Sequence, residues 1–84
     1  MRILYFAWLR HRVGTASEEI ELPAEVTTVG ALGDWLAERS PGFKEAWRAP
    51  GVVRVAVNHT HVTDAAVAVR PGDEVAFFPP VTGG

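Results

Sequence analysis

The chain has 84 residues, of which 48% are hydrophobic and 21% charged, and its formal net charge at pH 7 is -2. This length predicts one domain with a modest core and little spare volume for an internal active site, which argues against a self-contained enzyme. The small negative charge argues against nucleic-acid and membrane-surface partners, because both normally require a positive excess. The absence of cysteine excludes disulfides, zinc-thiolate sites and a cysteine nucleophile.

The N-terminal part of the chain predicts a strand, a helical turn and a second strand. Residues 2–7 are aromatic and branched and favour a strand, and residues 8–13 close as a helical turn that Gly14 stops. This apolar start is too short for a membrane span or a signal peptide, so we interpret it as the first strand of a cytoplasmic protein. Residues 17–22 alternate as a half-buried strand whose glutamates form a solvated edge, and the two strands suggest a hairpin.

One amphipathic helix is expected after Pro23 breaks the second strand. Thr28 caps this helix. Its apolar positions recur at intervals of three and four and are Val29, Leu32 and Leu36. Each interior glycine costs about 1 kcal/mol relative to alanine, so we expect Gly30 and Gly33 to let the backbone lie close against a sheet. The Pro-Gly pair at 41–42 is expected to end the helix.

The second half of the chain predicts three more strands. Valines alternate with other residues over 53–57, and two further valines suggest a fourth strand over 67–69. Residues 70–73 have proline and glycine where a β-turn requires them, and 74–78 form the last strand. The order strand, strand, helix, strand, strand, strand fits an α+β fold with one face of the sheet covered.

Several residues that could suggest a ligand site have simpler structural explanations. His59 and His61 are expected at a hairpin tip, facing solvent or lying at the rim of a partner. They do not predict a metal site, because no third ligand is near in sequence and His11 is remote. The tryptophans are expected in or at the margin of the core and are Trp8, Trp35 and Trp47.

The C-terminal end is the most informative feature, because it is a bare diglycine. Two glycines at a random terminus should occur in roughly one chain in 200. Glycine has no Cβ, so Gly83 and Gly84 could thread a narrow channel and bring the terminal carboxylate against a bound nucleotide. A frayed terminus is the simpler alternative. We therefore expect a domain over 1–78 and a flexible tail over 79–84.

The tail and the last strand suggest how a partner would be engaged. Six residues extend over about 20 Å, and the prolines Pro79 and Pro80 hold the start extended at low entropic cost. Val81 and Thr82 would then contact the channel wall. Strand alternation turns Phe78 away from the core, where it either packs under a loop or anchors a partner.

The chain resembles the small subunit of molybdopterin synthase, a MoaD-type sulfur carrier of the ubiquitin-like β-grasp superfamily. The residues that carry this resemblance are Leu4-Tyr5-Phe6-Ala7, Val57-Asn58, and the run from Gly72 to Gly84 that ends in Phe-Phe-Pro-Pro-Val-Thr-Gly-Gly. It covers the whole chain, and the final run is far more specific to the molybdopterin branch than the diglycine alone. The resemblance implies a β-grasp fold: a mixed sheet packed against one main helix, with an extended C-terminal tail.

The resemblance also implies a function. A MoeB-type enzyme would use ATP to adenylate the Gly84 carboxylate, and a sulfur donor such as a cysteine desulfurase would supply the sulfur for a thiocarboxylate. That group would donate sulfur to cyclic pyranopterin monophosphate in the pocket of a MoaE-type large subunit, within a heterotetramer. The small subunit would bind no cofactor and no metal, and Phe78 and His61 would lie in its partner interface together with the inserted tail, residues 79–84.

Three alternatives remain from the sequence. The chain could be the sulfur carrier of thiamin synthesis or a protein modifier that forms isopeptide bonds, because both share the diglycine. A passive β-grasp interaction module, whose diglycine is incidental, is the alternative of a different class.

Overall fold

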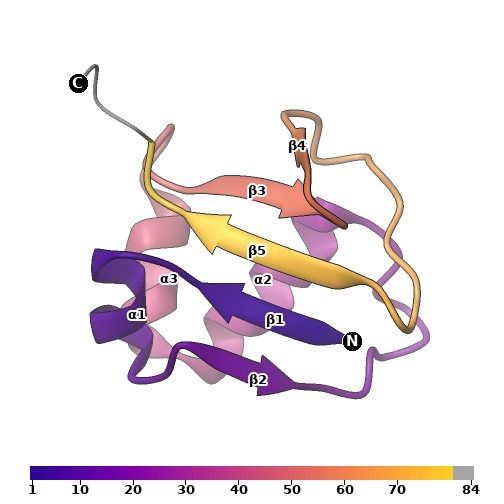
Figure 1. Cartoon of the computed structure of the whole chain (residues 1–84), viewed down its shortest axis with the longest axis horizontal. Helices are drawn as coiled ribbons and strands as arrows, with labels where there is room; N and C mark the ends of the chain where they lie inside the picture. The colour runs from indigo at the N-terminus through magenta and orange to yellow at the C-terminus, as the bar shows by residue number, and fades with distance from the viewer. Residues whose placement is uncertain (81–84) are drawn as a thin grey trace.

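The structure is a computed structural model and describes residues 1–80. A five-stranded mixed sheet has the order β2-β1-β5-β3-β4, in which β1 and β5 run parallel and the other neighbours antiparallel. The elements are β1 Arg2–Tyr5, α1 Trp8–Val13, β2 Ser17–Glu19, α2 Val29–Arg39, α3 Pro41–Arg48, β3 Arg54–Val57, β4 Thr60–Val62 and β5 Glu74–Phe78. Figure 1 shows α2 and α3 behind the sheet, so its other face is open. The expected α+β architecture is confirmed.

The N-terminal predictions are confirmed, with shorter strands. β1 and β2 pair antiparallel, so the expected hairpin forms, but β1 ends at Tyr5 and β2 at Glu19. α1 closes the connection between them. Gly14 ends α1 in the left-handed conformation, with φ 95°, and its N–H donates to the carbonyl of Arg10. Glycine adopts this conformation without the steric cost that a Cβ adds, which explains the stop.

The predicted amphipathic helix is α2, and its cap is confirmed. The Thr28 hydroxyl accepts a hydrogen bond from the N–H of Ala31 at 3.2 Å. The predicted apolar stripe, Val29, Leu32 and Leu36, is buried. Capping by threonine satisfies one of the free N–H groups of the first turn and is worth about 1 kcal/mol.

α2 ends at Arg39, before the Pro-Gly pair, as expected, but Pro41 begins a further helix, α3, that the sequence analysis did not predict. The Ser40 hydroxyl accepts a hydrogen bond from the N–H of Phe43 at 3.2 Å and caps it. Proline is well tolerated in the first helical turn, where its missing N–H has no helical partner. The Pro-Gly pair therefore marks the boundary between two helices. α3 buries Phe43 and Ala46 against the core.

The expectation that the helix glycines approach the sheet is wrong. A Cβ on Gly33 would lie 2.0 Å from the ring of Trp47 on α3, so this glycine admits the indole between two helices. Gly30 lies against Ala65 in the loop after β4, where an added Cβ would be 3.1 Å from the Ala65 Cβ. Both glycines allow close packing, but against a helix and a loop.

The fourth strand lies earlier in the chain than predicted. β4 is Thr60–Val62, which follows β3 through a two-residue turn at Asn58 and His59 with φ of 48° and 70°. Residues 67–69 instead pair with the segment that enters α2, through one isolated bridge between Thr28 and Ala68. Backbone hydrogen bonds from Val29 to Val67 and from Val69 to Thr27 hold this contact.

The core lies between the covered face of the sheet and the two main helices, and aromatic rings fill its centre. The Phe77 ring centroid lies 5.1 Å from that of Phe43 and 5.9 Å from that of Trp47, both edge-on. Tyr5 stacks on Phe77 at 6.2 Å. Edge-on and stacked pairs at such distances add about 0.5 to 1.5 kcal/mol beyond the area that they bury.

A polar link ties the β2 edge of the sheet to α2. The Tyr5 hydroxyl donates to Glu18 Oε2 at 2.7 Å, and the Arg39 guanidinium lies 3.3 Å from Glu18 Oε1. The interpretation of the β2 glutamates as a solvated edge is therefore wrong for Glu18. Burial, together with the neighbouring carboxylate, raises the pKa of Tyr5 above its ordinary value, so the hydroxyl keeps its proton and donates.

Candidate functional surface

Successive residues of β5 face opposite sides of the sheet. Val75 and Phe77 are fully buried on the covered face, whereas Ala76 and Phe78 are half-buried on the open face. The predicted orientation of Phe78 is therefore confirmed. The open face is the side toward the viewer in Figure 1. Pro79 follows directly after Phe78, the last residue of β5.

The sheet register gathers apolar side chains on the open face near the end of β5. Arg54 of β3 lies directly opposite Phe78, and the register of β1 and β5 continues to place Phe6 on the other side of Phe78. The neighbouring row of the same face consists of Leu4, Ala76, Ala56 and His61. We call these seven residues, Leu4, Phe6, Arg54, Ala56, His61, Ala76 and Phe78, the tail-side surface.

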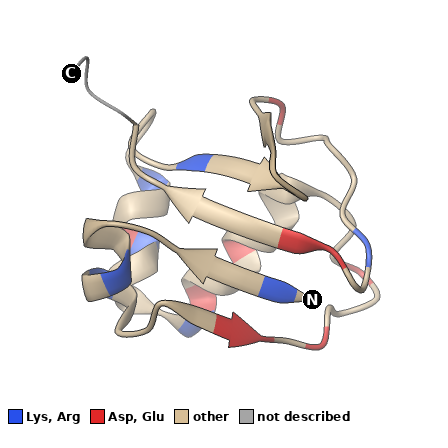
Figure 2. Cartoon of the chain, in the orientation of Figure 1, with Lys and Arg blue, Asp and Glu red and all other residues tan. Residues whose placement is uncertain are grey.

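The opposite end of the open face is charged. Arg2 pairs with Glu19 of β2 on one side and with Glu74 of β5 on the other. Figure 2 shows this concentration of red and blue where β1 and β5 begin, while the other end of the central strands is mostly tan. Charged side chains remain hydrated more favourably than apolar ones, so the tail-side surface is the part of this face suited to docking.

His61 lies in β4 and not at the hairpin tip, which corrects the prediction for this residue. Its ring centroid is 5.7 Å from that of Phe78, across the small Ala56 and Ala76. His59 does occupy the exposed turn, where its Nε2 lies 2.7 Å from Glu74 Oε2. The two histidines therefore lie at different sites, His59 in the turn before β4 and His61 on the tail-side surface.

Two exposed aromatic residues at the end of β1 were missed by sequence reasoning. Phe6 is 49% exposed and Trp8 is 39% exposed, so the expectation of Trp8 in the core is wrong. Ala7 between them has φ 56°, an uncommon conformation for a residue with a Cβ, and turns the chain from β1 into α1. α1 buries Leu9 alone, which leaves Trp8 outside with Arg12 5.7 Å over its ring. The alternation of strand β1 was the signal for Phe6.

Pro79 and Pro80 follow β5 and are half-buried. The four other residues of the predicted tail, Val81, Thr82, Gly83 and Gly84, lie outside the described residues. Pro79 thus directly follows Phe78, at the end of β5 where the tail-side surface lies. The structure places His61 beside Phe78, the residue before Pro79. The place of these residues in a partner interface stays a prediction.

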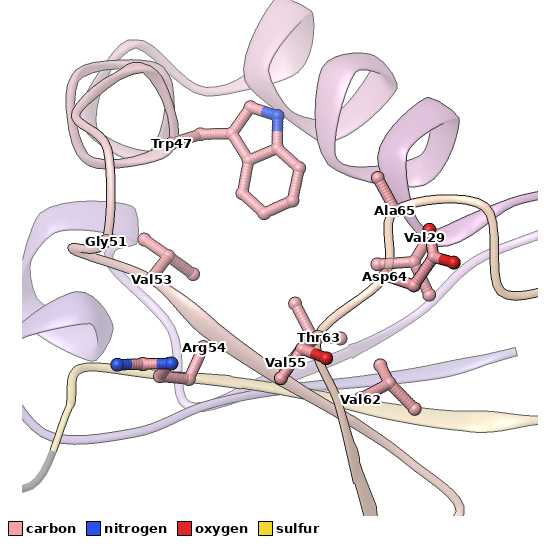
Figure 3. Close-up of a pocket in the computed structure, with 10 residues that line it drawn as sticks. All are labelled: Val29, Trp47, Gly51, Val53, Arg54, Val55, Val62, Thr63, Asp64 and Ala65. Carbon is pink, nitrogen blue, oxygen red and sulfur yellow. The ribbon is translucent and has the colours of Figure 1, made fainter.

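A separate recess of about 240 Å³ lies at the β3–β4 edge, on the helix side of the sheet. Figure 3 shows the Trp47 ring pointing into it from α3, with valines of the strands opposite. Its carboxylate, Asp64, already accepts a hydrogen bond from the N–H of Ala66 at 2.8 Å. The recess is lined by apolar residues together with Arg54, Thr63 and Asp64, and no salt bridge joins its charged side chains.

The described residues hold no other arrangement that points to catalysis or to metal binding. No group of three or more His, Cys, Asp or Glu side chains within residues 1–80 is placed to hold a metal ion. In the same part of the chain, no helix is both long enough and apolar enough to cross a membrane. The tail-side surface is therefore the candidate functional site.

Known proteins match this chain in sequence over its whole length. The sequence profile of the ThiS family matches residues 3–84. The chain belongs to the ThiS family. The molybdopterin synthase sulfur carrier subunit of Escherichia coli is 42% identical over 84 residues, with 100% of this chain and 99% of the relative covered.

Two solved structures extend the comparison within the β-grasp fold. A Pyrococcus furiosus protein superposes with a TM-score of 0.79 at 36% identity over 95% of each chain. SAMP1 from Haloferax volcanii gives a TM-score of 0.79 at 26% identity, with 99% of this chain and 97% of that chain covered. Relatives in this family are thus similar to this chain over nearly its whole length, which includes the strands that form the tail-side surface.

Proposed function

We propose that this chain is the sulfur carrier subunit of molybdopterin synthase and acts in the cytoplasm. The observation that supports this most directly is a relative of that name with 42% identity over the full chain. The alternatives, a thiamin-pathway carrier, a protein modifier and a passive β-grasp module, are not favoured by that name. The domain over 1–78 docks on partners, and the tail over 79–84 carries the chemistry.

The reactive group is the Gly84 carboxylate. A carboxylate is a poor electrophile, so a MoeB-type enzyme first joins it to AMP from ATP, with release of pyrophosphate. A persulfide sulfur from a donor such as a cysteine desulfurase then attacks the acyl carbon, and AMP leaves. A second thiol reduces the resulting acyl disulfide, which releases the donor as a mixed disulfide. The product is a thiocarboxylate, a soft nucleophile that transfers its sulfur to cyclic pyranopterin monophosphate; two carriers supply the two sulfurs of the dithiolene.

The tail-side surface supplies the docking that this chemistry requires. Phe78 and Phe6 offer exposed aromatic area, and His61 lies beside Phe78. Aromatic residues concentrate among the side chains that dominate protein interfaces. When this surface contacts the large subunit, six residues from Pro79 onward reach about 20 Å into the partner's substrate pocket, with Val81 and Thr82 against the wall.

Intact-mass measurement tests the proposal. The full chain is incubated with the MoeB-type enzyme, ATP and a sulfide source. We expect a mass gain that matches one oxygen replaced by sulfur and that fragmentation places at Gly84. The matched control, a chain without Gly83 and Gly84, should remain folded, gain no mass and support no sulfur transfer. A full chain that gains no mass, with an enzyme active on another carrier, would favour the passive module.

A further inference from the structure

Arg54 is the one charged residue of the tail-side surface. It is exposed at the first position of β3, and its Cα partner in β5 is Phe78, the last strand residue before the tail. Directly opposed residues of an antiparallel pair have Cβ atoms about 5 Å apart on the same face. Arg54 therefore lies beside the residue that directly precedes Pro79.

Arg54 has no acidic neighbour on the tail-side surface, whereas three other arginines have acidic partners. Arg2, on the same face, pairs across the sheet with Glu19 and Glu74. Elsewhere, Arg12 and Arg39 each lie 3.3 Å from a glutamate oxygen. Among residues 1–80, Arg54 makes no salt bridge, and the tail-side surface around it contains no Asp, Glu or Lys and no second Arg.

An uncompensated guanidinium in an apolar docking surface constrains the partner. If the partner covers it with apolar groups, the guanidinium loses its hydration with nothing to replace it, which disfavours the complex. If the partner offers a carboxylate, the planar guanidinium forms two parallel hydrogen bonds and fixes the orientation of the contact. Figure 3 shows the Arg54 guanidinium turned away from the recess, so it is not committed to that site.

We propose that Arg54 recognises an aspartate or glutamate side chain that the large synthase subunit presents beside the entrance for the tail. The inference rests on the proposed function and adds one specific contact to it. The apolar contacts of Phe78 and Phe6 do not fix an orientation, because the hydrophobic effect is non-directional. The hydrogen-bonded pair at Arg54 would therefore set the rotation of the small subunit about its tail. Arg54 is thus a specificity residue of the interface and takes no part in sulfur chemistry.

The test measures the dissociation constant of the large subunit for four full-length chains: wild type, Arg54→Ala, Arg54→Glu and Lys44→Glu. Lys44→Glu makes the same change in net charge on an exposed residue of α3, in the helix layer. We expect Arg54→Glu to weaken binding by about tenfold or more and Arg54→Ala by less, while Lys44→Glu stays within about twofold. Thermal unfolding of each variant verifies that the fold is intact.

Charge reversal in the partner completes the experiment. The exposed acidic residues of the large subunit are changed to lysine one at a time, and one of these changes should restore binding of Arg54→Glu. The inference is overturned if Arg54→Glu binds within about twofold of wild type, if Lys44→Glu weakens binding equally, or if no reversal restores it. A wild-type chain that does not bind the large subunit at all would overturn the proposed function as well, so the two failures are distinguishable.

Discussion

The two faces of β5 differ in what their side chains do, although the residues alternate along one strand. On the covered face, Phe77 is 0% exposed and contacts three aromatic rings. On the open face, Phe78 is half-buried and contacts the ring of His61. The same residue type thus fills the core at one position and lies on the open face at the next. Substitution of the two phenylalanines separates these roles.

The largest effect is expected for Phe77→Ala. Removing this ring leaves a cavity among Tyr5, Phe43 and Trp47, and the free energy of unfolding should fall by about 3 to 5 kcal/mol. Denaturant unfolding followed by tryptophan fluorescence measures the change. Phe77→Leu, which keeps most of the apolar volume, should lose clearly less. Equal losses for alanine and leucine would contradict the packing described here.

Phe78→Ala should produce the converse result. We expect it to weaken binding to the large subunit and to the MoeB-type enzyme by about 1 to 3 kcal/mol each, the range common for interface hot spots. The free energy of unfolding should change far less than in Phe77→Ala, because Phe78 lies outside the core. Calorimetric titration with each partner measures the affinities.

An unchanged dissociation constant with both partners would remove Phe78 from the interface. A loss with one partner alone would show that the two partners use different parts of the open face. A loss of stability as large as that of Phe77→Ala would mean that both faces of β5 serve the fold, and the comparison between them would fail.

The sequence predicts those features of the fold that depend on neighbouring residues better than those that depend on residues far away in the chain. Strand alternation predicted the orientation of Phe78, and hydroxyl capping predicted the start of α2 at Thr28, because both depend on neighbouring residues. The run over 72–84 predicted the family, and the flexible tail that it also indicated stays a prediction. These features need no knowledge of how the helices pack.

The errors occur where a residue serves a partner far away in the chain. The Pro-Gly pair at 41–42 is a stop signal in general, and its role as a helix start depends on the cap that Ser40 supplies. Gly33 accommodates Trp47, a contact that no sequence pattern reveals. Residues 67–69 have the composition of a strand, yet they pair with the entry to α2 because the hairpin after β3 has already occupied the sheet edge.

Only those residues of the candidate surface that a local pattern or the family resemblance indicates could be predicted. Phe78 and His61 could be named from the last strand and from the family resemblance. Arg54 could not, because its place beside Phe78 follows from the antiparallel register of β3 and β5, which the sequence leaves open. Residues that meet across strands become visible as a site only when the register is known.

The smallest expected effect concerns the end of the open face that lies away from the tail. The Asn58 amide donates to Asp73 Oδ1 at 3.0 Å, and the N–H of Arg70 donates to Asp73 Oδ2 at 2.9 Å. These hydrogen bonds, the side-chain one foremost, hold the pKa of Asp73 below its ordinary value. Because the folded pKa is the lower one, the stabilisation is complete above the unfolded pKa, near 4, and is lost as the pH falls through the folded pKa.

Asp73→Asn tests whether the end of the open face away from the tail contributes to stability and not to docking. The free energy of unfolding of wild type minus that of the variant should be constant from about pH 7 to 5 and should shrink below about pH 4. Affinity for the large subunit at neutral pH should equal that of wild type, because Asp73 lies outside the tail-side surface. A difference that grows on acidification would contradict the direction of the pKa shift. A loss of affinity would extend the docking surface to the charged end, and Arg54 would then be one of several charges that the partner meets.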